Sequence, residues 1–174
     1  MTSSSCSTES RIKHYSGDGE IKARPNHGFW GGGGGYTLQF KPIKLDHPAH
    51  FNYHFAGLPG WKAELLFAIE DSGWRGGGGR AEWDQRDLKG NLAMSLKDVK
   101  GKVVFQFEKK LSELEWSYGG QSPWELYDER AVNFTPDSRE YILDVTVDPD
   151  PILKDAIGYV LIEGGGHEPV SIGF

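Results

Sequence analysis

The sequence lacks several features that would narrow its function. It has a single cysteine, Cys6, among 174 residues, so no disulfide can form within the chain. Basic residues are the minority, with 19 Lys and Arg against 25 Asp and Glu, whereas phosphate-binding surfaces usually have the opposite balance. No apolar run reaches membrane-spanning length, and the N-terminus MTSSSCSTES lacks the apolar segment of a signal peptide. We therefore expect a soluble intracellular protein, cytoplasmic or nuclear, with no nucleic-acid partner and no membrane insertion.

The common motifs of catalysis and cofactor binding are also missing. There is no G-x-S-x-G, no P-loop, and no G-x-G-x-x-G between a strand and a helix. Cys6 falls within residues 1–10, a Ser/Thr-rich stretch that we expect to be disordered. We predict no cofactor, and the sequence identifies no catalytic residues. An enzyme with an unrecognised pocket stays an alternative, because two carboxylates facing across a cleft leave no sequence motif.

Glycine is abundant, but half of the 24 glycines are in three uninterrupted runs, at 31–35, 76–79 and 164–166. A phosphate-binding loop mixes glycine with Lys, Ser or Thr and opens a helix, whereas a flexible connector needs only glycine. We interpret the two longer runs, 31–35 and 76–79, as engineered replacements of native loops. Natural low complexity is the alternative interpretation.

The sequence is rich in alternating apolar and polar residues, which is typical of strands with one face on a core. In His50–Asp71, every second residue is apolar on both sides of a Gly-Leu-Pro-Gly turn, which predicts the two strands of a hairpin. We expect the following residues to lie inward in one core: Phe51, Tyr53, Phe55, Leu65, Phe67 and Ile69.

Similar alternation recurs along the chain, and helix signals are confined to Lys109–Trp116 and Pro151–Asp155. Ile157–Ile162 is apolar on both parities, as expected of a central buried strand. About nine or ten short strands separated by turn residues predict a single all-β domain over residues 11–174. We predict an antiparallel β-sandwich, with a closed lipocalin-like barrel as the alternative.

Three closely spaced histidines, His47, His50 and His54, are the best candidates for metal ligands. On a helix, His50 and His54 would have the spacing of zinc ligands. On the strand that the alternation predicts, they are roughly 13 Å apart and cannot share one ion. We therefore predict no metal site. A calcium site is a weaker alternative, with ligands Asp144, Asp148 and Asp150.

Aromatic residues make up 13% of the chain and include six tryptophans. They are dense in Trp116–Arg130, where they surround a Gly-Gly-Gln-Ser-Pro turn with charged residues at its edge. Protein interfaces combine aromatic anchors with a charged rim. We predict a non-catalytic binding module that recognises a protein or peptide partner through aromatic loop and sheet-face residues. The predicted partner-binding residues are Trp116, Tyr118, Trp124 and Tyr127.

Other functions remain open at this point. Exposed tryptophans also suit stacking on sugar rings, which would make the chain a carbohydrate-binding sandwich. A closed barrel would hold a small apolar ligand. Trp124 and Tyr127 also have a simpler interpretation, as strand residues that pack inward.

Overall fold

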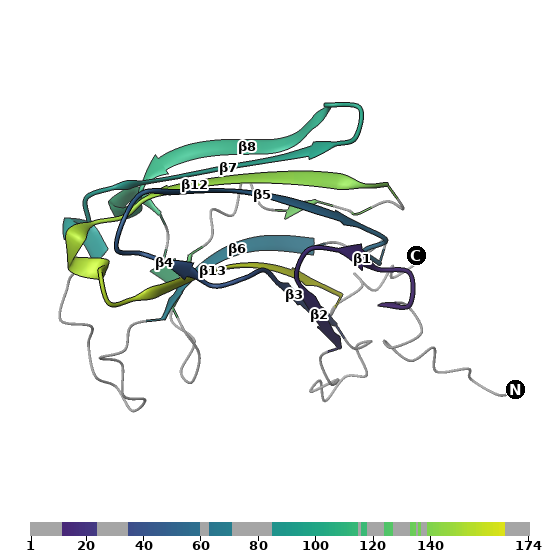
Figure 1. Cartoon of the computed structure of the whole chain (residues 1–174), viewed down its shortest axis with the longest axis horizontal. Helices are drawn as coiled ribbons and strands as arrows, with labels where there is room; N and C mark the ends of the chain where they lie inside the picture. Colours follow the sequence, from purple (N-terminus) through teal and green to yellow (C-terminus); the bar gives the residue numbers. More distant parts are fainter. Residues whose placement is uncertain are drawn as a thin grey trace, which may run out of the picture.

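The computed structural model describes residues 12–23, 35–59, 63–70, 85–114, 116–117, 124–126, 133–134, 136 and 139–165, and for 116–117, 124–126 and 133–134 the backbone alone. These residues form two antiparallel sheets, which lie as two layers in Figure 1. The predicted antiparallel β-sandwich is therefore confirmed. The predicted disordered tail at 1–10 and the glycine run at 76–79 lie outside the described residues, as does most of the run at 31–35.

Sheet A has five strands in the order β1-β5-β12-β7-β8. Its centre is formed by long strands in continuous register, with β12 paired to β5 on one side and to β7 on the other. The strands of sheet A are β1 (Ser16–Gly17), β5 (Ala49–Ala56), β7 (Asn91–Asp98), β8 (Val103–Lys110) and β12 (Tyr141–Asp148).

Sheet B has eight strands, several of them short, along the path β2-β3-β13-β6-β10-β9. Strand β13 is central, and β4 pairs with it beyond the end of β3, while β11 pairs with β6. The strands of sheet B are β2 (Glu20–Ala23), β3 (Tyr36–Gln39), β4 (Ile43–Lys44), β6 (Ala63–Glu70), β9 (Trp116–Ser117), β10 (Trp124–Leu126), β11 (Asn133–Phe134) and β13 (Ile157–Gly164). Three short 3₁₀ helices complete the described structure: η1 (Gln85–Asp87), η2 (Leu111–Glu113) and η3 (Pro151–Leu153).

The chain crosses repeatedly between the two sheets. Strands β5 and β12 of sheet A are each followed by a strand of sheet B, β6 and β13 respectively. The order β3-β13-β6-β10 facing β5-β12-β7-β8 is that of a jelly roll, which is built from interleaved Greek keys. The alternative of a closed lipocalin-like barrel is wrong, because within the described ranges the two sheets are separate hydrogen-bonded ladders.

The predicted hairpin in His50–Asp71 is wrong in its pairing, although both of its strands exist. Strand β5 pairs with β1 and β12, whereas β6 pairs with β13, β10 and β11. The connection after Gly57 thus carries the chain from sheet A to sheet B. Alternation shows which face of a strand is apolar, but it does not show which strand lies beside it. The two apolar faces meet across the core instead of along one sheet.

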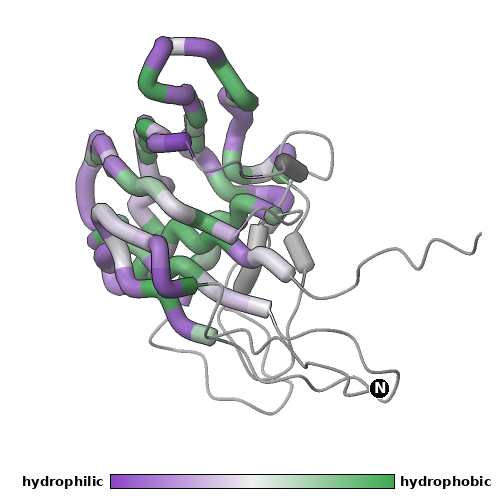
Figure 2. The backbone as a smooth tube through the Cα atoms, turned by 90° about the vertical axis from the view of Figure 1, so that its right-hand side faces the viewer, coloured by the Kyte–Doolittle hydropathy of each residue, from purple (hydrophilic) through white to green (hydrophobic). Residues whose placement is uncertain are grey.

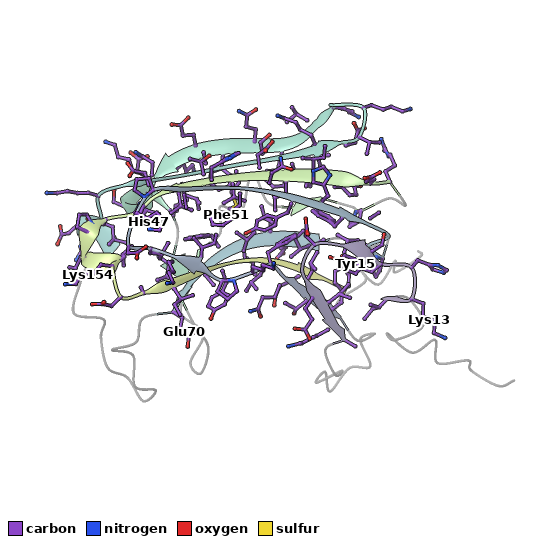
Figure 3. All side chains as sticks on the ribbon, in the orientation of Figure 1. Lys13, Tyr15, His47, Phe51, Glu70 and Lys154 are labelled. Atoms are coloured by element: carbon purple, nitrogen blue, oxygen red, sulfur yellow. The ribbon has the colours of Figure 1, made fainter. Side chains whose placement is uncertain are left out.

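One apolar core fills the space between the sheets. Phe55, Leu65, Phe67 and Ile69 are at most 1% exposed, which confirms their predicted inward position. Tyr53 is also buried, and Phe51 is half-buried against the same cluster, between the two sheets in Figure 3. The ring of Tyr53 stacks on that of Phe40 at a centroid distance of 4.4 Å. This contact joins the layers, because Phe40 follows β3 of sheet B and Tyr53 belongs to β5 of sheet A.

Strand β13 has the two apolar faces that its sequence predicts. Val160 and Ile162 belong to the core between the sheets. Leu161 lies on the opposite face, where it forms a second buried cluster with Leu66 and Ala68 of β6. The central position of β13, between β3 and β6, explains why it is apolar on both parities. No helix in the described part of the chain is long and apolar enough to cross a membrane.

Candidate functional site

The predicted aromatic site lies only in part within the described residues. Trp116 is in β9 and Trp124 is in β10, whereas Tyr118 and Tyr127 lie outside the described ranges. Trp124 is in register with Ile69 of β6, and Trp116 is in register with Leu126. Both tryptophans therefore belong to paired strands at one side of sheet B and not to a loop. Their contact with a partner stays a prediction.

The outer face of sheet A carries a group of polar residues from three adjacent strands. Asp144 of β12 is opposite Asn52 of β5 on one side and opposite Ser95 of β7 on the other. Residues opposite each other in antiparallel strands point to the same face of the sheet. His50 and Lys97 flank this row on β5 and β7. We call these five residues the sheet A face: His50, Asn52, Ser95, Lys97 and Asp144.

Asp144 is the centre of the sheet A face. Its Oδ1 accepts a hydrogen bond from Asn52 Nδ2 at 2.6 Å and lies 3.8 Å from His50 Nε2. Its Oδ2 lies 3.6 Å from Lys97 Nζ. The side chains of His50, Lys97 and Asp144 are 62%, 40% and 30% exposed, respectively. Ion pairs this accessible to water contribute about 0–1 kcal/mol each, so these contacts are not needed to hold the sheet together.

Ser95 adds an unsatisfied hydroxyl to the sheet A face. Its Oγ is shielded from solvent and has no hydrogen-bond partner within the described structure. Such a group lowers stability by about 1–3 kcal/mol relative to a paired one.

The sheet A face does not have the arrangement of a nucleophilic catalyst. In a Ser-His-Asp triad the histidine lies between the nucleophile and the acid. Here the acid is central, and strand β12 separates Ser95 from His50. Two strand spacings alone separate them by about 10 Å, and the offset of His50 along its strand adds to this, so they are beyond the reach of proton transfer.

The other candidates from the sequence have separate positions and roles. His50 and His54 lie on β5 as predicted, and His47 lies beside Asp46 near one end of the sandwich (Figure 3). Asp150, a proposed calcium ligand, accepts backbone hydrogen bonds from Lys89 and Ile152 and caps η3. Within the described ranges, no group of three or more His, Cys, Asp or Glu side chains is placed to hold a metal ion.

The phenol of Tyr53 is a buried polar group in the core. Burial, with a smaller contribution from the negative charge of Asp18, raises the pKa of Tyr53 to about 12. The Tyr53 hydroxyl has no hydrogen-bond partner in the described structure. At neutral pH this phenol stays protonated, so it is unsuited to act as a base or a nucleophile.

The sequence matches no protein-family model, and no curated protein is similar to it. The jelly-roll order does not supply a function either, because this architecture serves unrelated roles. Function must therefore follow from the chemistry of the surface. For the sheet A face, the alternation in the sequence shows only that each residue is on the polar side of its own strand. The grouping of these residues depends on strand register, for which the sequence carries no local signal.

Proposed function

We propose that the protein is a non-catalytic binding module that holds a protein or peptide partner on the outer face of sheet A. The observation that supports this proposal is the polar network around Asp144, which joins β5, β12 and β7 at the surface. The network contributes little to stability, and it presents a carboxylate, an amide and a cationic amine side by side. The module is proposed to be intracellular, cytoplasmic or nuclear.

The chemistry of the sheet A face favours a polypeptide partner. Asp144 and Lys97 have opposite charges, and Asn52 can both donate and accept hydrogen bonds. A polypeptide surface has the same mixture of charged and polar groups, whereas the phosphate backbone of a nucleic acid is bound mainly by cationic side chains. Small ligands bind in concave pockets, while a sheet face suits a second protein surface. A sugar platform would need aromatic rings here, but Tyr53 and Phe55 of β5 face the core.

The aromatic residues predicted from the sequence would form a second contact. Trp116 and Trp124 are in sheet B, the opposite layer from the sheet A face. Their participation, with that of Tyr118 and Tyr127, remains a proposal that is independent of Asp144.

The test uses peptides selected from a random display library on the intact protein. We expect Asp144→Ala to lower the affinity for the selected peptides about 30-fold, which corresponds to a loss of about 2 kcal/mol of binding free energy. Unfolding measurements should show that the substitution changes stability by less than about 1 kcal/mol. The matched control is Glu70→Ala, which removes an exposed carboxylate from sheet B, the other layer in Figure 3.

Two results would contradict the proposal. One is equal peptide affinity of the Asp144→Ala variant and the intact protein. The other is a library that yields no binder while a polysaccharide resin retains the protein, which would favour the carbohydrate-binding alternative.

A further inference from the structure

The turn between β7 and β8 presents a cluster of apolar side chains to solvent. Val99, Val103 and Val104 are 51%, 45% and 39% exposed. Single exposed apolar residues are common on protein surfaces, but several gathered at one turn indicate a contact surface. We call residues 98–104 the hairpin tip. It forms the upper margin of the molecule in Figure 1 and again in Figure 2, where apolar and polar residues are interleaved along the tube.

The hairpin tip is locally cationic in a protein with a net charge of −6. Lys100 and Lys102 are both exposed. The acid of the tip, Asp98, is 2% exposed, and its Oδ2 lies 3.2 Å from Arg139 Nη1. Its charge is therefore compensated. Among the described residues, an exposed acid near the tip is Glu140, which precedes β12 where that strand pairs with Asp98.

Hydrogen bonds to Asp98 fix the conformation of the turn that carries the exposed side chains. Asp98 Oδ1 accepts hydrogen bonds from the backbone amides of Lys100 and Lys102, each at 2.9 Å. The amide of Gly101 donates to the carbonyl of Asp98 at 2.8 Å, and the φ of Gly101 is +80°. A preformed turn loses little conformational entropy on binding, which favours its use as a docking element.

We propose that the hairpin tip docks the protein onto an anionic lipid surface. The valines would enter the boundary between headgroups and acyl chains, and Lys100 and Lys102 would stay at the lipid phosphates. The combination of exposed valines and lysines favours lipid, because an anionic bilayer offers phosphates directly above an apolar layer. A bilayer surface can deform around a protruding turn, so no matching groove is needed.

This inference goes beyond the proposed function. It also departs from the expectation of no membrane insertion, which followed from the acidic balance of the whole chain, because the positive charge is local to the tip. The tip shares no residue with the sheet A face.

Vesicle flotation of the full chain tests the proposal. We expect binding to vesicles of phosphatidylcholine mixed with phosphatidylserine, and little binding to phosphatidylcholine alone. A double substitution, Lys100→Gln with Lys102→Gln, should weaken binding about 30-fold, since each lysine near an anionic surface contributes about 1 kcal/mol. Val99→Ser should weaken it about fivefold by removing apolar area from the contact. Added salt should weaken binding because the charges are screened.

Matched controls lie beyond the other end of β7. Lys89→Gln with Lys154→Gln removes two exposed lysines there, and Ile152→Ser removes a side chain that is 54% exposed. Both controls should bind vesicles like the unchanged protein, and all variants should keep its melting temperature. The proposal is overturned if the protein binds neither type of vesicle, or if it binds both types equally well. It is also overturned if the tip variants bind vesicles as well as the control variants do. The same holds if the tip substitutions abolish binding to a protein and leave vesicle binding unchanged.

Discussion

Two glycines at turns show how differently one residue type can be constrained. Gly90 and Gly101 both have positive φ, at +101° and +80°. A Cβ atom on Gly90 would lie 2.2 Å from the carbonyl oxygen of Asp148, whereas one on Gly101 would meet nothing within 4 Å. Gly101 is therefore required for its backbone conformation alone. Gly90 is required for that and for the close approach of the turn after β12.

We predict that Gly90→Ala lowers stability clearly more than Gly101→Ala does. The second substitution should lower the free energy of unfolding by about 1–2 kcal/mol, the conformational penalty of a non-glycine residue at positive φ. The first adds a steric clash with main-chain atoms, and we expect a loss about twice as large. Urea unfolding of both variants measures the difference. Equal losses would show that the backbone around Gly90 moves aside without penalty.

Several elements could be predicted from local patterns, and others depend on tertiary contacts. Alternation predicts the strands β5, β6 and β12, and the run that is apolar on both parities predicts β13. The expected helix at Lys109–Trp116 is wrong, since β8 continues to Lys110 and only one 3₁₀ turn follows, at Leu111–Glu113. The pairing of Lys110 with Asn91 on β7 accounts for this extension. The pairing with β7 therefore outweighs the local helix propensity of this segment.

At the scale of the β7–β8 hairpin, Asp98 couples stability to pH. Backbone hydrogen bonds, first that from Lys102, hold the pKa of the Asp98 carboxyl below its ordinary value of 3.8. A carboxyl with a lowered pKa in the folded state stabilises that state above the ordinary pKa. The stabilisation is lost as the pH falls through the lowered value.

We predict that Asp98→Asn lowers the melting temperature at neutral pH. The gap between this variant and the unchanged protein should narrow as the pH falls below about 4, because Asp98 itself then becomes neutral. Thermal unfolding followed at a series of pH values provides the measurement. A gap that stays constant down to acid pH would mean that the Asp98 charge does not stabilise the hairpin.

The whole molecule is held by a core that both sheets share. Phe67 of β6 is fully buried in it, and its ring would lie 3.0 Å from a Cβ atom placed on Gly158 of β13. Phe40 of the same layer contacts Tyr53 and Phe55 of sheet A. The sequence shows that these residues are inward, but the jelly-roll order depends on pairings between distant segments. Asn52 and Asp144, at the heart of the candidate site, are 92 residues apart in the chain.

We predict that Phe67→Ala destabilises the whole sandwich by about 3–5 kcal/mol, the usual loss for truncating a buried phenylalanine. Because the core is shared, native-state hydrogen exchange should show lowered protection in β12 of sheet A as well as in β13 of sheet B. A loss under about 1 kcal/mol would contradict the core position of Phe67. Loss of protection in sheet B alone would indicate that the layers open separately.

The central strands of both layers come from the last part of the described chain. Sheet A is completed by β12 and sheet B by β13, and both follow residue 140. On the ribosome, β5 and β6 therefore emerge long before the strands that cover their edges. A chain made at about 5–20 residues per second exposes their apolar faces for seconds before either sheet can close. We therefore expect newly made copies to gain from chaperone protection during that interval. A fragment that stops before β12 lacks the central strand of each sheet and cannot form the native strand order.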